Sequence, residues 1–179
     1  MKKETKIAVV LLALLVTLGL LIGGQKLYNA NLIEKPVIKQ LTALDYIKNA
    51  AISKTDGVYK INVTFSKPGN LKEEYNQIDK IIAEKFKTRE YEIVIVDTRD
   101  QFLRDELEKM ELSIYQAVVR DDYVELEQRM GAAAVNDGFE YRLQIDRQNL
   151  YVQLRRDGKF LNEIIERNDT SGLQGNEKR

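Results

Sequence analysis

The stretch Val58-Tyr-Lys-Ile-Asn-Val-Thr-Phe65 alternates apolar and polar side chains along its whole length. In an extended chain, successive side chains point to opposite faces, so this alternation separates an apolar face from a polar one. The apolar face consists of Tyr59, Ile61, Val63 and Phe65. The stretch therefore predicts a strand with one buried and one solvent-facing side.

The residues that follow this strand predict a helix and a second strand. Asn70 with Glu73 resembles a helix cap, and apolar residues then recur at helical spacing up to Phe86. Tyr91-Glu-Ile-Val-Ile-Val96 has an unbroken apolar centre, which predicts a strand buried on both faces. Two strands joined by a helix of this length form a β-α-β unit with parallel strands.

The residues that precede the first strand favour another helix. Pro36 is suited to the first turn of a helix. Val37, Leu41, Leu44 and Ala51 then recur at roughly helical spacing. We expect one helix here that packs on the domain.

Residues 98–136 have a helical pattern that two arrangements would satisfy. Thr98-Arg-Asp-Gln101 resembles a capping box, and apolar residues at helical spacing follow it. Asp121 and Asp122 would cap a second helix, or a single helix would run through to about Asn136. The sequence leaves both arrangements open.

The last part of the chain predicts a three-strand antiparallel meander. Residues 139–145 and 150–155 alternate apolar and polar side chains, and the turn at 146–149 joins them. Asp157-Gly158 is a two-residue hairpin signal, and residues 159–167 form the final strand. The fold class is therefore α+β, with one domain over residues 36–167. Residues 168–179 are polar and are expected to be disordered.

The amino-terminal segment predicts a transmembrane signal-anchor helix at residues 7–24. This run carries no charge and would form about 27 Å of helix, enough to cross a thin bilayer. A cleaved signal is the alternative, but Gly24 and Ala30 are the nearest small residues and give poor cleavage sites. Lysines before the run predict a cytoplasmic tail at 1–6, a stalk at 25–35 and an extracytoplasmic domain.

The composition excludes several classes of function. The chain has no histidine and no cysteine, so it lacks a serine–histidine triad, a thiol nucleophile and a zinc site built on those ligands. Residues 1–30 hold four lysines and one glutamate, so the remaining chain has slightly more acidic than basic side chains. That balance argues against a nucleic-acid partner.

Asp97 and Asp100 are the candidate metal ligands. The strand at 91–96 delivers them to the carboxyl edge of the predicted parallel sheet, where such sheets bind ligands. Two carboxylates there would suit a divalent cation such as magnesium or calcium. The favoured interpretation is structural: both residues, with Thr98, cap the helix that follows.

The candidate partner-binding residues are Arg142, Tyr151 and Arg155. They belong to the predicted outward face of the meander, together with Gln144 and Gln153. Arginine and tyrosine on an exposed sheet face suit an acidic or glycan partner. The favoured interpretation is an ordinary solvated face, which an antiparallel sheet is expected to have. The strand at 160–167 offers an edge to which a partner strand would add.

The sequence favours a single-pass membrane protein with a non-enzymatic interaction domain. Its expected partner is another envelope or membrane protein, for which it would act as an accessory or scaffold subunit, and no cofactor is expected. The alternative hypothesis is a carboxylate-based enzyme or sensor that binds a divalent cation at Asp97 and Asp100.

Overall fold

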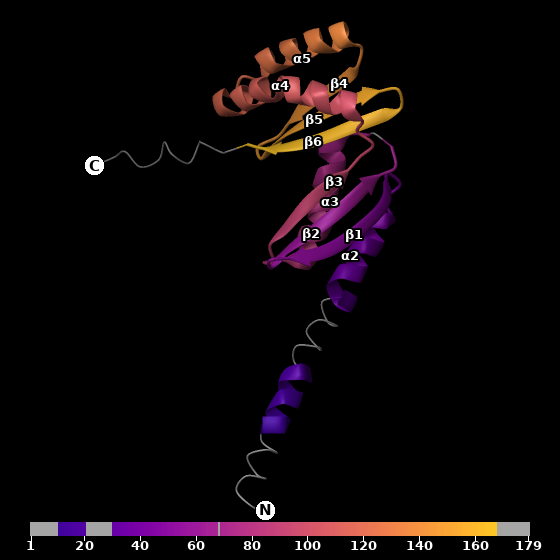
Figure 1. Cartoon of the computed structure of the whole chain (residues 1–179), viewed down its shortest axis with the longest axis vertical. Helices are drawn as coiled ribbons and strands as arrows, with labels where there is room; N and C mark the ends of the chain where they lie inside the picture. Colours follow the sequence, from indigo (N-terminus) through magenta and orange to yellow (C-terminus); the bar gives the residue numbers. More distant parts are fainter. Residues whose placement is uncertain (1–10, 21–29, 68, 168–179) are drawn as a thin grey trace, which may run out of the picture.

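The computed structural model describes residues 11–20, 30–67 and 69–167, and these show an α+β fold (Figure 1). From residue 30 onward the elements are a π-helix η1 (Ala30–Glu34), α2 (Lys35–Thr42), β1 (Ile47–Thr55), β2 (Val58–Phe65), α3 (Leu71–Phe86), β3 (Tyr91–Val96), α4 (Gln101–Arg120), α5 (Tyr123–Asp137), β4 (Glu140–Ile145), β5 (Asn149–Arg156) and β6 (Lys159–Glu166). They form two three-stranded sheets, ordered β1-β2-β3 and β4-β5-β6. Each sheet with its helices makes up one half of the domain.

In the first half, β2 is the central strand, and the alternation read from its sequence is confirmed. Tyr59, Ile61, Val63 and Phe65 are buried. Their core also contains Val37 and Leu41 of α2 and Ile78, Ile82 and Phe86 of α3. β2 and β3 are parallel and are joined through α3, as the β-α-β prediction required.

The helix predicted over residues 37–51 is wrong beyond Thr42, because β1 occupies residues 47–55. β1 pairs antiparallel with β2. Asp56-Gly57 joins the two strands in a tight turn, with positive φ angles of 53° and 90°. This dipeptide is the same hairpin signal as Asp157-Gly158. Leu41 is part of a genuine helix, whereas the recurrence continuing to Ala51 was coincidental.

The prediction that β3 is buried on both faces is also wrong. β3 is the last strand of its sheet, so one of its edges has no neighbouring strand. None of its residues is fully buried, and Val96 is 40% exposed. With only three strands, the sheet has an edge where the sequence pattern suggested a centre.

The second half contains two helices and the predicted meander. α4 ends at Asp121, which adopts a left-handed conformation with φ 56°. Asp122 then caps α5 by accepting a hydrogen bond from the amide of Glu125. β4, β5 and β6 form the antiparallel meander, and α4 and α5 pack on the face that carries Leu150, Val152 and Leu154.

The opposite face of the meander packs on the first half of the domain, so the expected outward row is wrong at Tyr151 and Gln153, whereas Arg142 and Arg155 are exposed. Tyr151 and Gln153 are buried, and Phe160 joins the core of the first half. The Tyr151 and Tyr75 rings meet edge to face at 5.9 Å. Alternation in the sequence identifies two faces of a strand but does not show what covers the second one.

At the amino terminus, residues 11–20 are helical, and all of them are exposed. Among residues 11–20, 30–67 and 69–167, no helix has both the length and the apolar composition needed to cross a membrane. The rest of the predicted span, at 7–10 and 21–24, lies outside the described residues, as do the predicted tails at 1–6 and 168–179. The predicted stalk differs in part, because Ala30–Glu34 is helical and Ile33 is buried in the core.

Candidate functional site

The segment between β3 and α4 connects the two halves of the domain through Asp97. The Asp97 side chain is only 2% exposed. Its Oδ1 accepts hydrogen bonds from the Arg99 amide and Nε at 3.1 and 2.8 Å. Its Oδ2 accepts from Arg99 Nη2 at 2.8 Å and from the Asn162 amide of β6 at 2.7 Å. Both oxygens of this candidate metal ligand are therefore occupied by donors from the protein itself.

Asp100 and Thr98 of the same segment accept hydrogen bonds from different elements. Asp100 caps α4 by accepting a hydrogen bond from the Leu103 amide at 2.9 Å, which confirms this part of the capping prediction. Thr98 Oγ1 accepts a hydrogen bond from the Phe160 amide at 3.1 Å. Within the described ranges, no group of three or more acidic, histidine or cysteine side chains is placed to hold a metal ion.

The predicted partner-binding residues are not brought together on one surface. Arg142 and Arg155 are exposed, whereas Tyr151 is completely buried. The Tyr151 hydroxyl donates a hydrogen bond to Asp146 Oδ2 at 2.8 Å. Tyr151 is thus part of the contact between the two halves and is not available to another protein.

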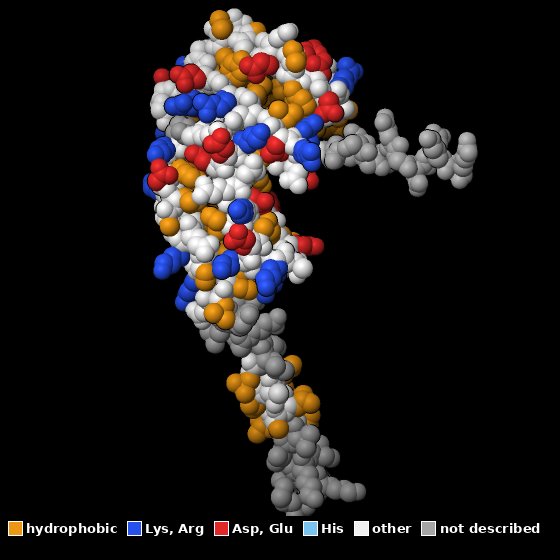
Figure 2. Space-filling view, turned by 180° about the vertical axis from the view of Figure 1, so that it is seen from behind, with side chains coloured by type: hydrophobic (Ala, Val, Ile, Leu, Met, Phe, Trp, Pro, Cys, Tyr) orange, Lys and Arg blue, Asp and Glu red, His pale blue; other side chains and the backbone are white. Residues whose placement is uncertain are grey.

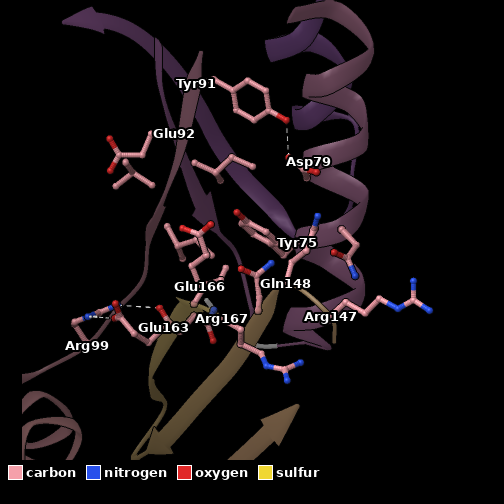
Figure 3. A pocket seen from close by; sticks show the side chains of 17 residues that line it. Tyr75, Asp79, Tyr91, Glu92, Arg99, Arg147, Gln148, Glu163, Glu166 and Arg167 are labelled. Carbon is pink, nitrogen blue, oxygen red and sulfur yellow. Dashed lines mark hydrogen bonds and ion pairs between the residues drawn. The ribbon is translucent and has the colours of Figure 1, made fainter. Parts of the chain in front are cut away.

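A cleft of about 1240 Å³ lies beside this junction, between β3 and β6 (Figure 3). One wall is β3, a second is the side of α3 that carries Tyr75 and Asp79, and the others are the turn at 147–149 and β6 from Asn162 to Glu166. The space-filling view shows that the surface is hollowed on one side, where the two halves meet (Figure 2). Sequence reasoning did not identify this cleft, which forms between strands about 70 residues apart.

The open edge of β3 forms one wall of the cleft. The Glu90 carbonyl accepts a hydrogen bond from the Tyr59 amide at 3.1 Å, which fixes the side on which the ladder to β2 is formed. Backbone groups alternate along a strand, so those of Tyr91, Ile93 and Ile95 point away from β2. Within the part of the chain that the structure describes, no backbone hydrogen bond pairs these three residues on their open side.

The edge of β6 is partly covered. The amides of Phe160 and Asn162 point away from β5 and are satisfied by Thr98 and Asp97. Arg99 Nη2 also donates to the Asn162 carbonyl at 3.0 Å. The predicted docking edge at 160–167 is therefore capped over its first half by the segment that follows β3.

Most of the charges around the cleft are paired, and Glu92 forms an ion pair with Lys60 of β2 at 3.4 Å. Four acidic side chains line it, Asp79, Glu92, Glu163 and Glu166, together with Arg99, Arg147 and Arg167. Arg99 is paired with Asp97 and Glu163, and Arg167 is paired with Asp121 at 2.7 Å. Because Asp97 and Asp121 lie outside the lining, two of the arginine charges are largely neutralised from behind the cleft wall.

Tyr91 is held in a defined state at one end of the cleft. Its hydroxyl donates a hydrogen bond to Asp79 Oδ1 at 2.7 Å (Figure 3). Burial and this hydrogen bond raise the pKa of Tyr91 above its ordinary value. The ring is therefore neutral at physiological pH, with the Asp79 carboxylate beside it.

A second, more apolar groove of about 520 Å³ lies between α4 and β6. Its floor contains Leu107, Ile114, Val118 and Ile165, and the exposed Tyr115 and Val119 stand at its rim. It shares Arg99, Glu163 and Glu166 with the larger cleft, so the two hollows adjoin at β6.

Comparisons of the chain with protein-family models, with curated proteins and with solved structures found no match. Function must therefore be inferred from the cleft itself. The sequence did contain a signal for the open edge of β3, which is the main feature of the cleft. Asp56-Gly57 announces the β1–β2 hairpin, and once β1 is placed beside β2, β3 becomes the other edge of the sheet.

Proposed function

We propose that this chain is a membrane-tethered docking protein whose domain binds an extended segment of another envelope or membrane protein along the open edge of β3. The observation that carries this proposal is the row of outward backbone groups at Tyr91, Ile93 and Ile95, unpaired among the described residues and facing a cleft. Strand addition to a free sheet edge is a common mode of peptide recognition, in which main-chain hydrogen bonds supply affinity.

The two edge strands of this sheet differ. β1 has features that prevent pairing with another chain, whereas β3 lacks them. β1 carries Lys48 and Lys54 and has a register irregularity between Ile47 and Asn49. Lysines and bulges are devices that prevent a strand edge from pairing with other chains. β3 has neither: its sequence is Tyr-Glu-Ile-Val-Ile-Val, and its ladder with β2 is regular.

Residues 11–20 support the proposed tether. All ten are exposed, and the leucines are distributed around the helix (Figure 2). A helix that is apolar on every side needs an apolar environment, and a bilayer supplies one. In this proposal residues 7–24 form the anchor, residues 1–6 stay in the cytoplasm and the domain lies outside it. Full-length protein should then remain in membranes after alkaline carbonate washing, and removal of residues 1–24 should release it.

The docking proposal is tested with two variants of the full chain, only one of which keeps the outward amide of residue 93. Ile93→Pro and Ile93→Ala both remove the isoleucine side chain, but only proline also removes the outward N–H. The ladder to β2 should survive in both variants, because proline is tolerated in an edge strand where its nitrogen faces away from the sheet. A photocrosslinker replaces Glu92 on the β3 side or, as a control, Ser53 on the β1 side.

We expect a discrete crosslinked partner from position 92 in intact cells, retained by Ile93→Ala and lost by Ile93→Pro. Position 53 should not give this product. Equal crosslinking in the two Ile93 variants, with both folded by circular dichroism, would show that the open backbone of β3 is not the binding element.

A further inference from the structure

β3 presents to the cleft the same row of side chains that β2 presents to β1. Tyr59, Ile61 and Val63 of β2 lie directly beside Tyr91, Ile93 and Ile95 of β3, in a parallel register. Both rows point to the face covered by α2 and α3. Along this face, β3 therefore repeats the pattern of β2: tyrosine, isoleucine and a β-branched residue.

The structure also shows what kind of strand pairs with such a row. β1 runs antiparallel to β2, with Ala50 opposite Val63, Ile52 opposite Ile61, and Lys54 opposite Tyr59. The Lys54 Nζ atom lies 4.6 Å from the centre of the Tyr59 ring, at cation–π distance. Cross-strand pairs of this kind are the units that stabilise a sheet.

We propose that the β3 edge selects an antiparallel segment of a partner protein with the pattern small–x–aliphatic–x–lysine, a chemical likeness of β1. This inference rests on the proposed function. Ala50-Ala-Ile-Ser-Lys54 is the example within the chain. In the partner segment, the lysine lies over Tyr91, the aliphatic residue meets Ile93 and the small residue meets Ile95.

The charges of the cleft fit such a segment at both ends. A lysine over Tyr91 lies next to Asp79, which already accepts the Tyr91 hydroxyl hydrogen bond. An antiparallel segment then lies along β3 with its other end near β6, where Glu166 lines the cleft beside the Arg99–Glu163 ion pair. A second lysine before the small residue, at the position of Lys48 in β1, reaches this acidic end. A basic segment is therefore favoured over an acidic one.

The shape of the cleft favours an extended segment over a second copy of the domain. α3, the 147–149 turn and β6 line the same cleft as the β3 edge (Figure 3). A single strand lying along β3 needs only the space next to the edge. A second copy would have to bring its own sheet and helices against the same walls.

The test uses full-length protein in lipid nanodiscs and a synthetic peptide with the sequence of residues 47–55, Ile-Lys-Asn-Ala-Ala-Ile-Ser-Lys-Thr, with blocked ends. Amide hydrogen exchange reports on β3. We expect the peptide to slow exchange at Tyr91, Ile93 and Ile95. Two control peptides have the same length. In the first, the residues that match Ile52 and Ser53 swap places, so the composition is unchanged. In the second, both lysines are replaced by glutamate. Each should bind about tenfold more weakly, because cross-strand pairs are lost.

The alternative outcomes separate the two proposals. Equal protection by all three peptides overturns the pattern but leaves strand docking intact. No protection by any peptide, together with equal crosslinking of Ile93→Pro and Ile93→Ala in cells, overturns both. Loss of protection at Ala51 and Ser53 shows that the peptide has replaced β1, which also overturns the pattern. Protection of β3 that rises with protein concentration, without peptide, identifies a second copy as the occupant instead.

Discussion

At the scale of single residues, Asp97 lies in a helix-capping sequence but binds a strand that is distant along the chain. The sequence places Asp97, Thr98 and Asp100 at the start of a helix, and capping chemistry accounts for Asp100 alone. Asp97 and Thr98 instead accept hydrogen bonds from the amides of Asn162 and Phe160 in β6. These partners are 65 and 62 residues away along the chain, so no local pattern announces them.

Replacing the two aspartates by asparagine should therefore have unequal effects on stability. Asp97→Asn removes one of the two carboxylates paired with the half-buried Arg99, and Glu163 is the other, so it should lower the free energy of unfolding by about 2 kcal/mol. Asp100→Asn should change it by less than about 0.5 kcal/mol, because asparagine caps a helix as well as aspartate does. Urea unfolding measures both values, and equal losses would contradict the role assigned to Asp97.

Asp146 should make stability depend on pH. Burial favours a raised pKa, but hydrogen bonds from the Tyr151 hydroxyl and the amides of Asn149 and Gln148 outweigh it and lower the pKa of Asp146 below its ordinary value. The carboxylate then contributes stability above the unfolded pKa of about 4, and this contribution is lost as the pH falls through the folded pKa.

The Asp146→Asn variant should therefore be less stable than the natural chain at about pH 7, and the difference should shrink below about pH 4. Urea unfolding at several pH values measures it. Tyr151→Phe removes only the hydroxyl donor and should give a weaker form of the same trend. A difference that stays constant with pH would show that ionised Asp146 does not contribute.

At the scale of elements, strands and helices with a clear period were predictable from sequence, and their surroundings were not. The alternation at 58–65 and the Asp157-Gly158 turn specify local geometry, and the structure confirms both. The burial of Tyr151 and the exposure of β3 depend on which elements pack together. Because the cleft arises from that packing, the sequence predicts its β3 wall to be interior and its β6 wall to be an open strand edge.

The break between α4 and α5 is an element boundary that the sequence left open, and it should depend on one cap. Asp122 accepts a hydrogen bond from the Glu125 amide at the start of α5. Asp122→Ala should cost about 1 kcal/mol of unfolding free energy, whereas Asp122→Asn should be nearly neutral. Thermal unfolding followed by circular dichroism measures the difference, and an Ala variant as stable as the Asn variant would show that the cap is dispensable.

At the scale of the whole molecule, the two halves share a continuous junction, and the cleft lies beside it. Tyr151 of β5 belongs to the core of the first half, while its neighbours Leu150 and Val152 belong to the core of the second. Asp97 and Arg99 connect the end of β3 to β6 at the same place. Because β5 has one face in each core, it couples the two halves. We therefore expect β3 and β6, which form opposite walls of the cleft, to keep their positions relative to each other.

This coupling predicts that residues 30–167 unfold as one cooperative unit. Tyr151→Ala should cost about 3–5 kcal/mol, because it leaves a large cavity at the junction. Native-state hydrogen exchange should then show similar losses of protection in α3 and in α4, although each helix packs mainly in its own half. Leu126→Ala, in the core of the second half alone, is the matched comparison and should also lower protection in α3. If either variant weakens only one half, the halves are independent, and a partner strand bound at β3 would meet a cleft whose far wall moves.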